Sequence, residues 1–118
     1  MKRSAIVMIA LFMMVVFTIT ASAQVNTRGR LTLLRVHDVG TGFGPPTDFI
    51  DVEVVIGLDG APGQFFGFQL RNDAKLPARQ GMLDLLRDAF ERNLIVNIDF
   101  FQRPGKTNHI LFRTWLAK

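Results

Sequence analysis

The sequence predicts a mainly β domain that contains one helix. Short segments in which apolar and polar residues alternate, the pattern of half-buried strands, lie on both sides of residues 78–93. Within 78–93 the apolar residues instead recur every three or four positions, as they do on one face of a helix. The chain has no cysteine, so burial of apolar side chains must hold this fold without disulfides or a thiolate metal site.

Residues 1–23 are predicted to be a cleaved secretory signal. Two basic residues precede an uncharged apolar run over 5–19, and the small residues Ala21-Ser22-Ala23 form a typical cleavage pattern. The alternative is a transmembrane anchor, but the run is short for a full span. The expected product is a secreted or periplasmic single domain, 24–118, with no membrane span after processing.

The expected mature chain has 95 residues, 118 less the 23 of the signal, and is only mildly basic. Loss of Lys2 and Arg3 leaves 12 basic and 10 acidic residues, a net charge of +2. This charge does not indicate a nucleic-acid partner. Because a domain of this size has a modest core, we expect association into a homo-oligomer to add stability.

The first strand is expected over 30–37, after a polar segment, 24–29, that is expected to fray. Adjacent Leu33 and Leu34 break the alternation, which a bulge or a strand buried on both faces would explain. The Gly- and Pro-rich residues 39–47 predict a connecting loop, with an exposed contact at its phenylalanine as the alternative. No Gly-Lys-Ser/Thr or helix follows, so the loop is not a phosphate cradle.

The second strand is expected over 49–58 and the third, antiparallel to it, over 64–71, with a turn at 59–63 between them. In the second strand Asp51 and Glu53 are expected to face outward. The opposite, buried face is expected to carry Ile50, Val52, Val54, Ile56 and Leu58. In the third strand the residues expected inward are Phe66, Phe68 and Leu70, and those expected outward are Phe65, Gly67, Gln69 and Arg71.

The helix is expected to begin near Pro77 and to end at Asn93, which tolerates the left-handed conformation of a helix end. Its apolar stripe is Met82, Leu83, Leu85, Leu86, Ala89 and Phe90. The opposite face, suited to water or to a partner, carries Asp84, Arg87, Asp88, Glu91 and Arg92.

A β-hairpin is expected to close the chain, with strands over 94–101 and 110–116 and turn residues over 103–108. The element order is then strand, strand, strand, helix, strand, strand. This is the order of the OB-fold, a five-stranded Greek-key barrel capped by one helix.

Catalysis is not expected, because serine and cysteine are absent after residue 23. Asp51 and Glu53 could act as a carboxylate pair, but outward acidic residues on a strand are ordinary. His37 and His109 lie in different strands without metal-ligand spacing, which favours structural or surface roles. We therefore expect no enzyme activity, no metal and no cofactor.

The sequence places more large aromatic side chains on the outward positions than a small monomer is expected to expose. Trp115 is expected in the core or an interface rather than as a ligand platform. Outward Phe65 and Phe101 are consistent with a subunit interface or with burial on both sides of the sheet.

The segments 81–99 and 104–111 resemble the helix-plus-hairpin half of the OB-fold B subunits of pentameric bacterial toxins of the pertussis and subtilase-cytotoxin type, over roughly the last 40 residues. The resemblance implies a ring of five protomers, helices lining a central pore, an A subunit on the polar helix face and recognition of sialylated glycans. Those B subunits generally have a disulfide and use tyrosine and serine for sugars, whereas 24–118 contains no Cys, Ser or Tyr. No glycan-binding residue is carried over.

Three functions follow in order of preference. The first is a secreted, non-catalytic module resembling a toxin B subunit, a homopentamer that recognises host glycans. The second is a periplasmic OB-fold structural or interaction protein without a toxin partner. A nucleic-acid-binding OB-fold is third, because export and the small net charge argue against it.

The predicted ligand site follows from OB-fold architecture, in which strands two and three bind ligands together with the loops after strands one and four. A guanidinium can grip a sialic-acid carboxylate, and amides suit sugar hydroxyls. The candidates are Gln69, Arg71, Arg103, Lys106 and Asn108. The alternative is that all five are ordinary solvated residues.

Exported protein should begin at Gln24, because Ala21-Ser22-Ala23 supplies the small residues that signal processing requires. Intact-mass measurement of the exported chain checks this. A mass that still includes residues 1–23 would contradict the predicted signal.

Overall fold

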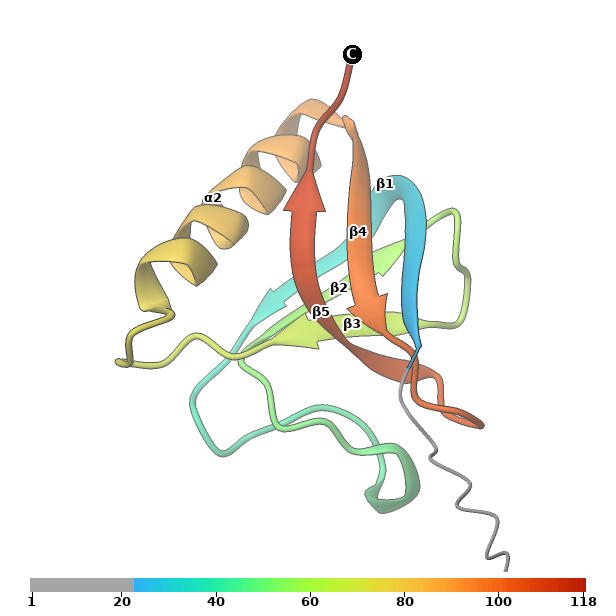
Figure 1. Cartoon of the computed structure of the whole chain (residues 1–118), viewed down its shortest axis with the longest axis vertical. Helices are drawn as coiled ribbons and strands as arrows, with labels where there is room; N and C mark the ends of the chain where they lie inside the picture. Colours follow the sequence, from blue (N-terminus) through green and yellow to red (C-terminus); the bar gives the residue numbers. More distant parts are fainter. Residues whose placement is uncertain (1–22) are drawn as a thin grey trace, which may run out of the picture.

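The structure, a computed structural model, describes residues 23–118. The predicted signal therefore lies outside the described residues, apart from Ala23. The elements in chain order are β1 (Gln24–Val36), the short 3-10 helix η1 (Pro46–Asp48), β2 (Val54–Leu58), β3 (Phe65–Phe68), α2 (Leu76–Arg92), β4 (Ile95–Phe101) and β5 (Asn108–Trp115) (Figure 1).

The five strands close into a barrel in the order β1-β2-β3-β5-β4. All neighbours pair antiparallel except β3 and β5, which pair parallel over a short stretch. Helix α2 connects β3 to β4 and packs against β1, β4 and β5. The prediction of a mainly β, OB-fold-like barrel with one helix is confirmed.

Side chains from all five strands and α2 fill the barrel. Val96, Ile98 and Phe100 alternate into it along β4, as predicted, and Phe66 packs edge-on against Phe100 with 4.7 Å between ring centroids. Leu86 of α2 closes the core and is fully buried. The barrel is therefore held by apolar burial, in keeping with the absence of cysteine.

The expectation that 24–29 frays is wrong. These residues form the first half of β1, which pairs with β4 from Gln24 opposite Phe101 to Arg30 opposite Ile95. The less exposed positions of this segment carry Val25, Thr27 and Gly29, so a sequence with few apolar residues still forms a strand once β4 supplies hydrogen bonds.

Strand β1 turns a barrel corner at its middle, where its partner changes from β4 to β2. The register with β2 shifts between Leu31 and Leu33, and Leu33 and Leu34 pack against different cores, so both explanations offered for the broken alternation find support. A Cβ atom on Gly29 would lie 2.7 Å from the Gly60 nitrogen, so glycine lets the two segments approach at this corner.

The second strand is shorter than predicted, because it begins at Val54 rather than at 49. The chain bends at Glu53, so residues that alternate on one face in sequence lie on different sides of the sheet. Val54 faces the barrel interior, whereas Val52 packs outside it. Glu53, expected to face outward, is only 3% exposed. The prediction failed because apolar residues continue through the bend, although they serve two different cores.

The second core lies on the outer side of β1, β2 and β3. It consists of Ile50, Val52 and Val55, with Leu33, Phe43, Phe65 and Ile110 packed around them. Phe65 and Phe43 contact each other with ring centroids 5.2 Å apart. Phe65 is therefore covered by the protein's own loop, so burial on both sides explains it without a subunit interface.

Helix α2 agrees with its predicted boundaries within two residues. Pro77 lies in its first turn, and Asn93 ends it with φ 53° while its N–H donates to the carbonyl of Ala89. Phe90, expected in the buried stripe, is 47% exposed. Leu86 and Ala89 face the barrel and are fully buried, whereas Phe90, the next residue around the helix, faces away from it. The buried stripe of the helix is therefore narrower than the set of apolar residues predicted.

Leu86→Asp should prevent folding, whereas Arg87→Ala should leave the thermal midpoint nearly unchanged. Leu86 is fully buried, and an unpaired buried carboxylate costs several kcal/mol, comparable with the roughly 5–15 kcal/mol stability of a whole domain. Arg87 makes one exposed ion pair, with Asp84 at 3.3 Å. Thermal unfolding followed by circular dichroism makes the comparison, and similar midpoints for both variants would contradict this helix orientation.

Candidate functional site

The predicted ligand residues surround one segment, the β1–β2 loop (residues 37–53). Gln69 donates from its amide to the backbone carbonyl of Asp51 at 3.0 Å. Arg71 donates to Glu53 Oε1 at 2.9 Å and to Asp51 Oδ1 at 2.8 Å. Hydrogen bonds from its guanidinium to Glu53 and then to Asp51 raise the pKa of Arg71 above its ordinary value. This first group fixes the end of the loop to the segment after β3.

The second group joins the same loop to the β4–β5 loop (residues 102–107). Arg103 donates from Nη1 to Asp48 Oδ1 at 3.2 Å, and the Thr107 hydroxyl donates to Asp48 Oδ2 at 2.7 Å. The Asn108 amide donates to the Asp48 carbonyl at 2.8 Å, and Lys106 donates to the carbonyl of Thr47. This group fixes the middle of the β1–β2 loop.

Asp48 is the centre of that second group. The Thr107 hydroxyl is the largest cause that lowers the pKa of Asp48, followed by backbone N–H groups of Thr107 and Asn108 and the charge of Arg103, against a partial burial that raises it. The carboxylate therefore stays ionised and keeps both loops together.

These contacts close the surface at which OB-folds usually bind ligands. The β1–β2 loop lies over the outer side of β1, β2 and β3, with Phe43 on Phe65 and the Arg35 guanidinium 5.7 Å from the Phe43 ring centroid. All five predicted residues contact or border this loop, in two separate groups. Each of the two arginines already faces a carboxylate, so a ligand role for the five stays a prediction.

Both histidines bond to backbone groups. His37 Nε2 lies 2.7 Å from the carbonyl of Val52, and His109 Nδ1 accepts from the N–H of Arg103 at 3.1 Å. The His109 ring is buried against Phe66 and Phe100. Burial is the main cause that lowers the pKa of His109; Asp48 raises it and Arg103 lowers it further.

Within residues 23–118, no three His, Asp or Glu side chains are placed so that they could hold a metal ion. A search of the same range for a helix long and apolar enough to cross a membrane also found none.

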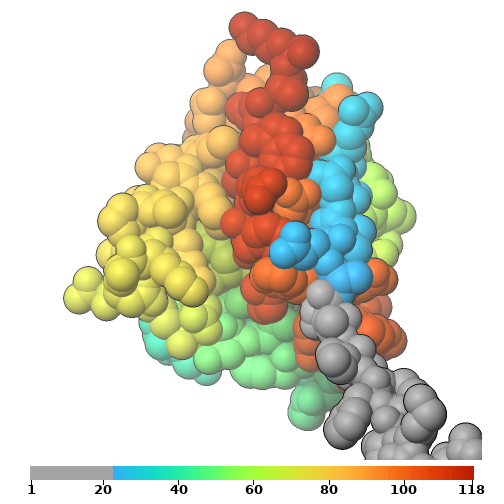
Figure 2. Space-filling model, viewed as in Figure 1, coloured from blue at the N-terminus to red at the C-terminus, as the bar shows by residue number. Residues whose placement is uncertain are grey.

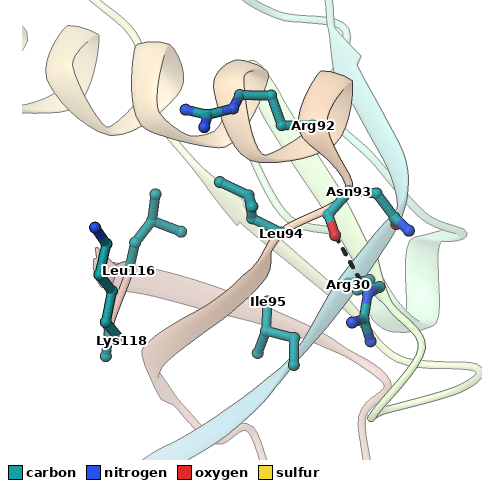
Figure 3. A pocket seen from close by; sticks show the side chains of 8 residues that line it. Arg30, Arg92, Asn93, Leu94, Ile95, Leu116 and Lys118 are labelled. Atoms are coloured by element: carbon teal, nitrogen blue, oxygen red, sulfur yellow. Dashed lines mark hydrogen bonds between the residues drawn. The ribbon is translucent and has the colours of Figure 1, made fainter.

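A cavity of about 540 Å³ lies at the opposite end of the barrel, where the end of α2, the start of β4 and the chain after β5 meet (Figure 3). We call it the end cavity. Its cationic side chains are Arg30, Arg92 and Lys118, and its apolar ones are Leu94, Ile95 and Leu116. This volume falls within the range of about 300–1,000 Å³ that is typical of small-ligand sites.

The cations of the end cavity are only lightly engaged by the protein. Arg30 donates from Nε to the Asn93 carbonyl at 3.2 Å, the dashed line in Figure 3. Arg92 is 66% exposed and lies 3.5 Å from Asp88. None of the described residues that line the cavity is an aspartate or glutamate. The arrangement is suited to an anionic group that carries a small apolar portion.

Sequence patterns did not indicate the end cavity, because its cations come from three elements distant in the chain. The one available signal was the pair of neighbouring apolar residues Leu94-Ile95 directly after the helix end, of which Ile95 begins β4. Both line the cavity, and Ile95 is exposed.

The fold therefore defines a protein class, the small mainly β proteins with an OB-fold-like barrel. Comparison of the chain with protein-family models, with curated proteins and with solved structures gives no match.

His109→Gln should flatten the fall in stability between pH 7 and pH 5. Since the folded-state pKa of His109 is lowered from an unfolded value of about 6.5, the unfolded chain binds the extra proton first as the pH falls. The stability that neutral His109 contributes is therefore fully present above its unfolded-state pKa. It is lost as the pH falls toward its lower folded-state pKa. Glutamine does not titrate and offers a carbonyl to Arg103 N–H. Urea unfolding at both pH values measures the difference, and equal slopes for wild type and variant would contradict it.

Proposed function

We propose that the chain is an exported, non-catalytic binding module that holds an acidic sugar of a host glycan in the end cavity and works as a homo-oligomer, as toxin B subunits do. One observation carries the proposal: the end cavity combines Arg30, Arg92 and Lys118 with an apolar lining and has no acidic side chain among the described residues around it. The ligand is thereby placed at the opposite end of the barrel from the loops, where Arg71 and Arg103 each donate to a carboxylate. At the end cavity Arg92 has only an exposed ion pair with Asp88, and Arg30 donates to a backbone carbonyl.

The chemistry of an acidic sugar supports this choice. A planar guanidinium binds a carboxylate through two parallel hydrogen bonds, and the cavity wall offers one guanidinium on β1 and another at the end of α2. The acetamido methyl group and ring carbons of a sialic acid suit the exposed Ile95 and Leu116. The signal pattern of residues 1–23 supports export.

The second candidate function is a periplasmic structural or interaction protein without a toxin partner. The observation that favours it is the β1–β2 loop, because it covers the surface that OB-folds usually offer to a ligand. On this alternative the end cavity binds no glycan, so the binding experiment separates the two functions.

The mature chain should bind sialyllactose, and it should bind lactose, which lacks the carboxylate, much more weakly. Arg30→Gln and Arg92→Gln should each weaken sialyllactose binding about tenfold or more, since a charge-assisted hydrogen bond contributes about 1.5–3 kcal/mol. Isothermal titration calorimetry measures both ligands.

Two further variants serve as controls. Arg87→Gln removes a 62% exposed arginine of the same helix that lies outside the end cavity, and it should leave binding unchanged. Arg103→Gln tests the site predicted among the loops. Loss of binding in Arg103→Gln together with normal binding in Arg30→Gln would assign the ligand to the loops instead, and equal affinity for lactose would contradict an anion site.

A further inference from the structure

The end cavity continues into an open face of the sheet. Arg30 of β1 and Ile95 of β4, which both line the cavity, are direct register partners. Because Val96 and Ile98 are fully buried, Ile95, Asn97 and Asp99 point to the outside of the barrel. The side chains that follow the cavity along β4 are therefore on its outer face.

Register places two further rows of side chains beyond the cavity. Directly paired residues of antiparallel strands present their side chains on the same face. The first row is therefore Trp115, Asn97 and Arg28, and the second is Arg113, Asp99 and Asn26. Rows lie two residues apart, about 7 Å along the strands, a spacing comparable with one pyranose ring.

Neither α2 nor the β1–β2 loop covers this face. In Figure 2 the spheres of β5, β4 and β1 lie side by side toward the viewer, with α2 to one side. The half-buried Trp115 ring lies in the row next to the cavity, directly opposite Asn97. An aromatic ring beside amide and guanidinium groups can contact both the apolar face and the hydroxyls of a sugar.

The charges of this face are compatible with an acidic ligand. The only carboxylate in the two rows belongs to Asp99, and both of its oxygens are engaged: Asn26 Nδ2 donates to Oδ1 at 3.0 Å, and Arg113 Nη1 lies 3.1 Å from Oδ2. Arg28 and Arg113 are exposed. The face is therefore cationic at its rim, like the cavity that it adjoins.

We infer that the end cavity is the first of two subsites and that the next sugar of a linear oligosaccharide lies on the row of Trp115, Asn97 and Arg28. This inference rests on the proposed function, because it takes the acidic sugar to occupy the cavity. It adds the size of the ligand: an oligosaccharide with an acidic terminal sugar, rather than an acidic monosaccharide.

The experiment compares the methyl glycoside of N-acetylneuraminic acid with sialyllactose on the mature protein. The oligosaccharide should bind about fivefold to tenfold more tightly, as expected for one added aromatic contact. Trp115→Ala should remove this gain while the affinity for the monosaccharide stays unchanged. Trp115→Phe, which keeps an aromatic ring, should retain most of the gain and shows that the loss in Trp115→Ala is not a folding defect.

Fluorescence gives an independent measurement, because Trp115 is the only tryptophan of the chain. Its emission should change on addition of sialyllactose and stay constant on addition of the monosaccharide. Equal affinities for the two ligands, or tryptophan emission that does not change when sialyllactose binds, would overturn the second subsite and leave the cavity site in place. Failure of both ligands to bind would overturn the proposed function and this inference together.

Discussion

Burial of β2 on both of its faces is the constraint on which the rest of the structure depends. Val54 and Ile56 face the barrel, and Val55 faces the second core, where it packs with Ile50 and Val52. A strand with two apolar faces is stable only when both are covered, so the β1–β2 loop must stay in place. The backbone N–H and C=O groups of the loop become partly buried there, so they need hydrogen-bond partners.

Asp48 and Glu53 supply the connections that keep the loop there. Glu53 is nearly inaccessible to water and is neutralised by Arg71, while its Oε1 also accepts from the N–H of Leu70 at 3.0 Å. An unpaired charge in such a position destabilises a protein by several kcal/mol, so arginine and glutamate depend on each other. The residues that the sequence offered as ligand contacts are engaged in holding the fold, so the proposed binding surface is the end cavity instead.

The fold followed from local patterns wherever one side of an element was apolar and the other polar. The alternation of β4 and the left-handed helix end at Asn93 were both predictable for this reason. Prediction failed at Glu53, because the alternation of apolar and acidic residues over 50–54 continues unchanged through a bend in the chain. It failed at 24–29 because that half of β1 pairs with a partner strand about 70 residues later in the chain.

The surroundings of the candidate site residues were harder to predict than the fold. Residue chemistry identified Arg71 and Arg103 as cations near the expected loops, but only the structure shows that each is paired with a carboxylate. Arg30 and Arg92 have no common spacing, and both line the end cavity because β1 and the end of α2 converge at one end of the barrel. Proximity of this kind depends on tertiary packing, which no local pattern contains.

The pairing of β1 with β4 also determines when the molecule can become a barrel. Gln24 pairs with Phe101, so the first strand of the domain has no β4 neighbour until nearly the whole chain has been synthesised. Contacts between residues so distant in sequence form slowly, because the intervening chain must lose its freedom before the contact is gained. A growing chain of this protein therefore cannot close its barrel until its last two strands have been synthesised.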